Sequence, residues 1–395
     1  MTETIVAFLV FLLLLGALTR ETFVIVLIYL GVGAFLLNRW WSIRVLTKIT
    51  YTRQFEHKVF PDETVAVRLE LVNPTILPAV WLRIQDFYPI EIADNRHFYQ
   101  VISLAPREHA ALEYNLTARK RGYYPVGPLE MSTGDLLGLS PEQTCRGESD
   151  YLTVYPKVIS ITDPFLPSRS PMGSLRYHQP IFEDPSRPAG KRDYQAGDSL
   201  RRIDWKATAS SGRLQVKLFE PSIALETALF VNLNLVEYST KDRVSGPELA
   251  IVAAASLANW IIAKRQSAGL YTNGVDLLNL QVDSQPIPPR KGRPHLMRML
   301  ENLARIKTRE TAPFVELLRR HRAALTWGTT LIVITGSTDQ ALFDELLQDQ
   351  RAGMSVVLVL CGWQTGITEA RLRARIAGVT LVDLPDEEAF KAWQR

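Results

Sequence analysis

Residues 329–361, TTLIVITGSTDQALFDELLQDQRAGMSVVLVLC, decide the fold of the C-terminal half of this 395-residue chain. The stretch contains two short apolar runs, Thr329–Thr335 and Ser355–Cys361, which are rich in β-branched residues and have the length of buried strands. Between them, Asp339–Arg351 places apolar residues at helical spacing. A strand, a helix and a second strand in this order predict two buried parallel strands joined by a helical crossover.

The same alternation extends outward through residues 223–395. Further strands are predicted at Thr227–Leu235, Gly269–Gly274, Leu277–Val282 and Val379–Val382, and further helices at Pro247–Lys264, Arg293–Ile306, Ala312–Leu325 and Ala370–Ile376. Strands that alternate with helices predict an α/β domain with a doubly wound parallel sheet. Within it, Leu249–Ile262 is short for a bilayer span and contains Ser256 and Asn259, so a buried helix fits it better than a third transmembrane helix.

Residues 43–161 follow a different pattern, in which apolar side chains occupy every second position. Thr64–Val72 alternates in this way, as a half-buried strand does. Shorter runs of the same kind are found at Trp81–Ile84, His109–Ala118 and Tyr151–Tyr155, with turn signals such as Asn73-Pro74 between them. Short strands at this spacing predict an antiparallel β-sandwich that serves as a spacer or interaction module.

Residues 1–42 predict a transmembrane helical hairpin. Two apolar stretches, at about 4–19 and 22–38, flank a polar turn, and each is near the lower limit of about 17 residues for a bilayer span. One such span alone fits a core helix or a signal sequence, but two in tandem satisfy their own backbone hydrogen bonds in lipid. Basic residues follow the second stretch, which predicts a two-span membrane protein with its soluble region in the cytoplasm. Trp40 and Trp41 fit either an interfacial anchor or packing under the first soluble domain.

Composition argues against several classes of protein. A net charge of +4 without a long Lys/Arg block argues against nucleic-acid binding. Cys145 and Cys361 stand far apart, which argues against a disulfide framework or a cysteine-based zinc site and fits a reducing compartment. The sequence has no P-loop, no G-x-S-x-G elbow and no H-E-x-x-H motif. We therefore expect no enzyme activity and no cofactor, and we identify no small-molecule substrate.

Residues 162–189 hold six prolines and predict an extended connector, and residues 190–222 follow it with a dense group of charged and aromatic side chains. Residues 190–221 read GKRDYQAGDSLRRIDWKATASSGRLQVKLFEP. Gly197-Asp198 predicts a turn, Asp204 is expected to pair with Arg201 or Arg202, and Trp205 to contribute a large buried surface. Seven basic residues face four acidic ones. Two interpretations stay open: a docking or anion-binding surface, or an ion-pair network that locks the connector onto the last domain.

This segment resembles the signature of the domain-of-unknown-function 58 family, R-x-Y-x-x-G-D-x-x-R-x-I-x-W, followed by small residues and a strand ending in F-E. The positions that carry the resemblance, with the adjoining Lys206, are Arg192, Tyr194, Gly197, Asp198, Arg201, Ile203, Asp204, Trp205, Leu214 and Phe219-Glu220. Further matching stretches are Arg121–Tyr123, Gly134–Leu139 and Val154–Pro156, so the resemblance spans nearly the whole chain.

The resemblance implies that residues 223–395 are similar to a von Willebrand factor A domain. In such domains the first strand, a later threonine and a later acidic residue hold a divalent cation. The corresponding positions here are Asn232, Asn234, Thr311 and Thr335, the last of which stands in place of the acidic residue. Asparagine brings no charge, whereas magnesium is usually bound through one or two carboxylates, so we expect no functional metal site.

The resemblance also implies a function: a membrane-anchored adaptor that binds proteins and associates with a MoxR-type AAA+ ATPase. The role would be chaperone-like, in the assembly or maturation of other proteins or of the cell envelope. One alternative is a purely architectural envelope protein. Another is an enzyme that binds a phosphate or other anion around Asp198, Arg201, Asp204 and Lys206, although no nucleophile–base pair supports such chemistry.

Overall fold

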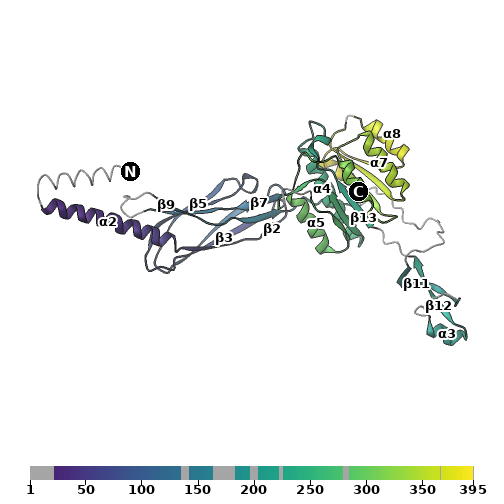
Figure 1. Cartoon of the computed structure of the whole chain (residues 1–395), viewed down its shortest axis with the longest axis horizontal. Coiled ribbons are helices and arrows are strands. Elements are labelled where there is room, and N and C mark those ends of the chain that lie inside the picture. Colours follow the sequence, from purple (N-terminus) through teal and green to yellow (C-terminus); the bar gives the residue numbers. More distant parts are fainter. Residues whose placement is uncertain are drawn as a thin grey trace. The chain divides into compact units, whose positions relative to one another are not determined.

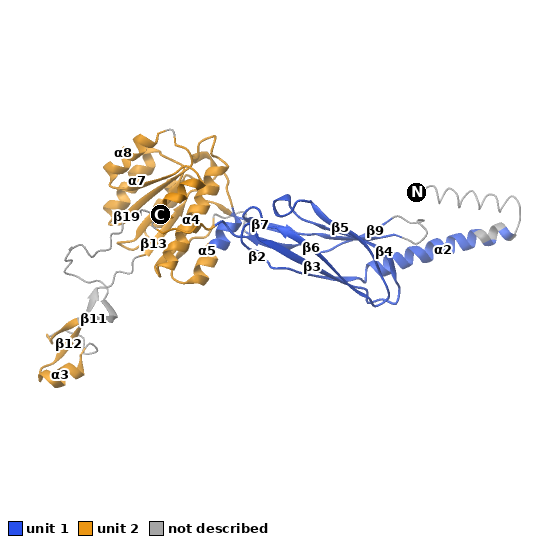
Figure 2. Cartoon of the chain, turned by 180° about the vertical axis from the view of Figure 1, so that it is seen from behind, with its two compact units in different colours: residues 1–157, 276–279, 300–306 blue, residues 158–275, 280–299, 307–395 orange. Residues whose placement is uncertain are grey.

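The computed structural model describes residues 22–134, 142–162, 183–195, 203–221, 226–278, 284–364 and 366–394. The chain divides into two compact units, which are coloured separately in Figure 2 and labelled by element in Figure 1. Unit 1 comprises residues 1–157, 276–279 and 300–306, and unit 2 comprises residues 158–275, 280–299 and 307–395. Each unit has a hydrophobic core of its own.

Helix α2, Thr22–Leu46, passes from an exposed apolar segment into the core of unit 1. At its C-terminal end Val45 and Leu46 are buried, and Trp41 Nε1 donates to the carbonyl oxygen of Pro78 at 3.0 Å. Nearer its N-terminus the large exposed side chains are Phe23, Val26, Tyr29, Leu30, Leu36 and Leu37. Exposed apolar side chains over several helical turns support membrane association of this end of α2.

The predicted second span, 22–38, is therefore helical, but the helix continues without a break to Leu46. Trp40 and Trp41 were expected either to anchor the helix at the membrane interface or to pack under the first soluble domain, and the two residues differ in this respect. Trp41 packs against the sandwich core, whereas Trp40 is 56% exposed, as an interfacial anchor requires. The predicted first span, 4–19, lies outside the described residues.

The β-strands of unit 1 form a sandwich-like arrangement. One sheet has the order β1-β3-β6 and another the order β5-β4-β8-β9, while β2, β10 and β7 form a small third sheet. The strands are β1 (Thr50–Gln54), β2 (Lys58–Val59), β3 (Thr64–Val72), β4 (Ala79–Phe87), β5 (His97–Leu104), β6 (His109–Thr117), β7 (Gly122–Val126), β8 (Leu129–Thr133), β9 (Gln143–Arg146) and β10 (Asp150–Val154). Leu69 and Leu71 of β3 share a core with Leu82 and Ile84 of β4.

The alternation predicted for residues 64–72 is confirmed, because every second residue of β3 from Val65 to Leu71 is buried. The expected antiparallel pairing holds for most strands but not for β2 and β10, which pair in parallel. Strand β5 was not predicted from the sequence. It is an edge strand and exposes apolar residues such as Tyr99 and Val101, so its apolar and polar residues do not alternate as they do in a half-buried strand. Cys145 and Cys361 are free cysteines.

Unit 2 contains a six-stranded sheet of order β16-β14-β13-β18-β19-β20, parallel except for β16. Its strands are β13 (Glu226–Val231), β14 (Ser267–Thr272), β16 (Ile287–Arg290), β18 (Thr330–Thr335), β19 (Ser355–Cys361) and β20 (Thr380–Leu384). Its helices are α4 (Ser245–Ala263), α6 (Phe314–Arg322), α7 (Gln340–Arg351) and α8 (Ile367–Ala377); α5 spans Arg293–Arg305, and the short elements are η3 (Leu235–Glu237), β15 (Val275–Asp276), β17 (Ile306–Lys307) and η4 (Glu387–Ala392).

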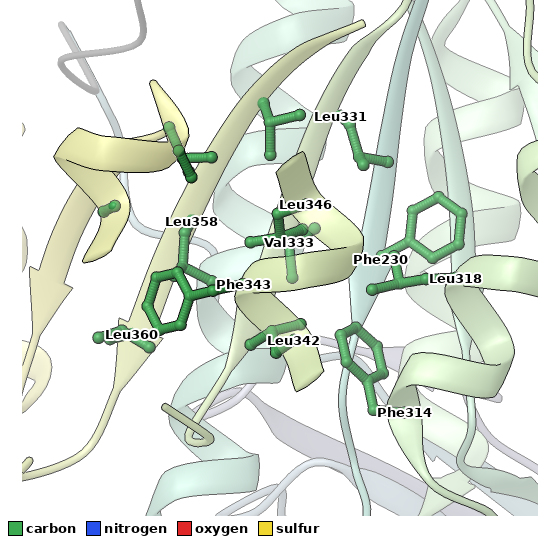
Figure 3. Close-up of a cluster of buried hydrophobic side chains, with 14 of the residues drawn as sticks. Phe230, Phe314, Leu318, Leu331, Val333, Leu342, Phe343, Leu346, Leu358 and Leu360 are labelled. Atoms are coloured by element: carbon green, nitrogen blue, oxygen red, sulfur yellow. The ribbon is translucent and has the colours of Figure 1, made fainter. Parts of the chain in front are cut away.

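Both faces of this sheet are covered, which explains the nearly continuous apolar runs of its strands. On one face Phe230, Leu331 and Leu358 pack against Phe314 of α6 and Phe343 of α7 (Figure 3). On the other face α4 contacts β13, β14, β18 and β19. Helix α4 is long and apolar enough to cross a membrane, but 78% of that stretch is buried inside the unit, so the predicted buried helix is confirmed.

In unit 2 one predicted strand is not formed where it is described, and one observed strand was not predicted. Of the strand predicted at 277–282, the structure describes only Leu277 and Leu278, and these two residues lie in a turn. Residues 279–283 lie outside the described residues. Strand β16 was missed because Pro288 and Pro289 argue against a central strand. Both prolines are tolerated since β16 is the antiparallel edge strand.

Candidate functional site

The signature segment forms a small hairpin of its own. Strand β11, Glu183–Asp193, pairs antiparallel with β12, Gln215–Pro221, and the seven-residue helix α3, Trp205–Ser211, lies between them in sequence. Ile203 bridges to Val216, and these two side chains, 7% and 2% exposed, form the buried centre of the hairpin. The predicted strand that ends in Phe219-Glu220 is thereby confirmed.

Asp204 holds this hairpin together. Its Oδ1 accepts hydrogen bonds from the backbone N–H groups of Lys206 and Ala207, each at 3.1 Å, which makes it the N-cap of α3. Its Oδ2 lies 2.9 Å from Lys191 Nζ. The hydrogen bond from Lys191 and the backbone N–H of Ala207 lower the pKa of Asp204 below its ordinary value. The predicted partners Arg201 and Arg202 lie outside the described residues, and the partner that the structure shows is Lys191.

Trp205 is 68% exposed, so the expectation that it supplies a large buried surface is wrong. The physical reason is local: Asp204 caps the helix, Trp205 becomes its first residue, and no residue of α3 is buried. The side chain therefore projects from a short helix whose start is fixed by the cap. An exposed tryptophan on an ordered element is a feature of protein-binding surfaces rather than of a closed ion-pair network.

The remaining signature residues contribute backbone contacts or lie outside the description. Arg192 Nη1 donates to the carbonyl oxygen of Asp193 at 3.2 Å, and the backbone N–H of Tyr194 donates to the carbonyl oxygen of Leu214 at 2.8 Å. Gly197, Asp198 and Arg201 are not among the described residues. Over residues 190–195 and 203–217 five basic side chains stand against two acidic ones: Lys191, Arg192, Lys206, Arg213 and Lys217 against Asp193 and Asp204. Over the whole described hairpin, residues 183–195 and 203–221, the charges nearly balance, because Arg187 is added on the basic side and Glu183, Asp184 and Glu220 on the acidic side.

A second cluster of predicted residues meets at the carboxyl end of the parallel sheet. Asn232, directly after β13, donates from Nδ2 to Thr335 Oγ1 at the end of β18, at 2.8 Å. Asn234 donates from Nδ2 to the carbonyl oxygen of Thr311 at 3.2 Å. The four positions named from the sequence therefore form two hydrogen-bonded pairs, Asn232 with Thr335 and Asn234 with Thr311. The backbone N–H of Asn234 donates to Asn232 Oδ1 and links the two pairs. The chain passes from β13 to β14 on one side and returns to β18 on the other, so the cluster lies at the topological switch point of the sheet.

Sequence reasoning missed two members of this cluster. Glu237 accepts hydrogen bonds from Asn232 Nδ2 at 2.8 Å and from Asn234 Nδ2 at 3.1 Å. Asn273, after β14, donates from Nδ2 to Asn232 Oδ1 at 3.1 Å. For Asn273 the available signal was position, because polar residues that follow neighbouring parallel strands gather at one edge of a sheet.

A pocket of about 320 Å³ opens beside this cluster, between the N-terminal ends of α6 and α7. Its wall combines the apolar side chains Phe314 and Leu342 with the polar groups of Glu237, Ser337 and Asp339. No group of three His, Cys, Asp or Glu side chains suited to a metal ion occurs in the described ranges. The lining is divided evenly between apolar residues and charged or polar ones.

Comparison with known proteins places the chain in a family. A family model described as "Protein of unknown function DUF58" matches residues 190–389. The chain is 27% identical over 196 residues to the uncharacterized protein YeaD of Bacillus subtilis (strain 168), over 49% of this chain and 45% of that protein. The match therefore spans less than half the length of this curated relative.

Two solved structures show weaker likeness. An aerotolerance-related membrane protein from Bacteroides fragilis NCTC 9343 is 12% identical, with a TM-score of 0.32 over 43% of this chain and 96% of that one. The CARDB domain of a Pyrococcus furiosus protein is 14% identical, with a TM-score of 0.20 over 27% of this chain and 91% of that one. These scores support no structural argument. The family match, in contrast, covers both the signature hairpin and the six-stranded sheet, and the chain belongs to the DUF58 family of proteins of unknown function.

Proposed function

We propose that this protein is a non-enzymatic, membrane-associated adaptor that binds other proteins from the cytoplasmic face and works with a MoxR-type AAA+ ATPase. The role is chaperone-like, in the assembly or maturation of other proteins or of the cell envelope. Helix α2 supports the membrane part of the proposal through its exposed apolar segment. The soluble part is supported by the α/β unit, which we take to be von Willebrand factor A-like, with a pocket at its switch point.

One observation carries the proposal: Trp205 is two-thirds exposed at the start of a capped helix, within residues 190–195 and 203–217, where basic side chains outnumber acidic ones. Large aromatic side chains supply much of the binding energy at protein interfaces, and a basic surface favours an acidic partner. The proposal assigns two roles within the signature. Asp204 keeps the hairpin folded, and Trp205 is free to contact the ATPase.

The experiment is affinity purification of the tagged full-length protein from native membranes, with and without ATP, followed by mass spectrometry. We expect an AAA+ ATPase to be recovered with the wild-type protein. A clean preparation that lacks any AAA+ ATPase even after mild crosslinking would contradict the adaptor proposal.

Trp205→Ala is predicted to weaken binding of the ATPase by about 2 kcal/mol, a rise of about thirtyfold in Kd, because the variant removes the exposed anchor. Less ATPase should then be recovered with the variant. The melting temperature should stay within about 1 °C of wild type, since an exposed side chain changes stability by no more than about 0.5 kcal/mol. Trp327→Ala is the matched control, because Trp327 is 62% exposed and lies outside the hairpin. Equal ATPase recovery by the Trp205 and Trp327 variants would show that Trp205 has no part in binding.

Asp204→Ala tests the structural role of the cap. Loss of an N-cap carboxylate costs about 0.5–2 kcal/mol of local stability, so α3 should fray. Hydrogen–deuterium exchange of residues 203–217 measures this, and we expect faster exchange in the Asp204 variant but not in the Trp205 variant. The opposite ranking would reverse the roles that we assign to these neighbours.

A further inference from the structure

The orientation of the Asn232 amide is fixed by a neighbour whose role is unambiguous. The backbone nitrogen of Asn234 carries a hydrogen and can only donate, and it lies 3.0 Å from one terminal atom of the Asn232 side chain. That atom must therefore be the acceptor, Oδ1. The other terminal atom, Nδ2, is then the one that lies 2.8 Å from Thr335 Oγ1 and 2.8 Å from Glu237 Oε2.

The same reasoning fixes the second amide. Two backbone N–H groups, those of Val236 and Thr311, each lie 3.3 Å from one terminal atom of Asn234, which must again be the oxygen. Its Nδ2 then points to Glu237 Oε1 at 3.1 Å. Because the backbone N–H of Phe314 also donates to Oε1, at 2.9 Å, the Glu237 carboxylate accepts three hydrogen bonds.

This arrangement does not fit the divalent cation that a von Willebrand factor A-like fold would hold at this edge. A cation of that kind binds oxygen lone pairs, whereas the amide N–H groups of Asn232 and Asn234 both point at the Glu237 carboxylate and occupy its oxygens. Turning either amide to offer its oxygen would bring its NH₂ against a backbone N–H donor. Thr311 Oγ1, buried and without a hydrogen-bond partner among the described residues, adds one oxygen but no charge.

We propose that an amide–carboxylate network of Asn232, Asn234 and Glu237 takes the place of the cation. The network ties the end of β13 to the end of β18 through Thr335 and to the start of α6 through Phe314. It holds the pocket wall, to which Glu237 and Phe314 belong, in one conformation without bound metal. Asn232 acts in it as a positioning residue.

The test compares wild type with Asn232→Asp in the full-length protein, with Mn²⁺ or Mg²⁺ alone as probes. Wild type should show a melting temperature that changes by less than about 1 °C between excess EDTA and excess metal, and no stoichiometric Mn²⁺ binding by titration calorimetry. Asn232→Asp places a second carboxylate beside Glu237, which should lower the melting temperature in EDTA. Added metal should then raise it by about 4 °C or more. Asn115→Asp, on an exposed position of β6, controls for the added charge.

The outcomes separate cleanly. A metal-independent wild type together with a metal-responsive Asn232 variant supports the network. Stoichiometric Mn²⁺ binding by wild type, lost in Glu237→Gln, would overturn it and restore a metal site. An Asn232 variant that responds to metal no more than the Asn115 control would overturn the placement of the amide at the cation position. If the Asn232 variant does not fold, wild-type Mn²⁺ titration alone still decides between the two descriptions.

Discussion

Replacing Asp86 by asparagine lowers the free energy of unfolding of unit 1 by about 3–5 kcal/mol, because the change leaves a buried guanidinium without its main partner. Arg53 contacts Asp86 through two hydrogen bonds, Nη2 to Oδ1 at 2.8 Å and Nε to Oδ2 at 3.0 Å, and neither side chain is exposed. Tyr114 Oη donates to Asp86 Oδ2 at 2.6 Å. Burial raises the pKa of Tyr114, and the Asp86 charge raises it further, so the phenol stays protonated and keeps donating.

The control is Asp150→Asn. Asp150 also contacts Arg53, at 2.5 Å, but its side chain is 45% exposed, so water replaces much of what is lost and the cost should be about 1 kcal/mol or less. Hydrogen–deuterium exchange of the full-length protein resolves unit 1 from unit 2. We expect the slowest amides of β3 and β4 to exchange at least about a hundredfold faster in the Asp86 variant. Similar exchange in the two variants would mean that the buried pair contributes no more than an exposed one.

This pair also shows what sequence patterns can and cannot predict. The alternation of β3 is visible in the sequence because each exposed residue follows a buried one. Arg53 and Asp86 are polar residues on strands β1 and β4, and nothing local distinguishes them from exposed charges. Their pairing depends on how two sheets pack, which is a long-range property. Buried ion pairs of this kind therefore emerge only from the structure.

The candidate sites divide in the same way. Asn232, Asn234 and Thr335 could be placed together from the sequence, because the ends of parallel strands meet at one edge of the sheet. Glu237 could not, since its role depends on the turn of η3 that follows Asn234. Trp205 was predicted to be buried on the strength of its size, a rule that fails where the helix is too short to have a buried face. Trp205, the residue that departs from this rule, is also the residue that we propose to contact the ATPase.

Arg322→Met is the second substitution with a large expected effect, a loss of about 3–5 kcal/mol in unit 2. Glu345 and Asp349 lie four residues apart on α7, on one face of the helix, and their side chains are only 1% and 2% exposed. Arg322 of α6 hydrogen-bonds to both carboxylates. Without it, Glu345 keeps Arg319, whose Nε lies 2.8 Å from Oε2, but Asp349 has no second ion pair among the described residues. Arg319→Met is the matched control, expected to cost about 1 kcal/mol or less because Arg319 is 62% exposed.

The loss caused by Arg322→Met should depend on pH in a direction set by Asp349. Burial raises the pKa of Asp349 above its ordinary value, and Arg322 offsets only part of that rise. A carboxyl whose pKa is raised by folding contributes full stability below its unfolded pKa, about 4, and loses that contribution as pH rises through the folded pKa. Removing Arg322 raises the folded pKa further, so the difference in urea midpoint between wild type and variant should be small near pH 4 and grow towards pH 7. A difference that shrinks with rising pH would mean that Arg322 does not stabilise the ionised form of Asp349.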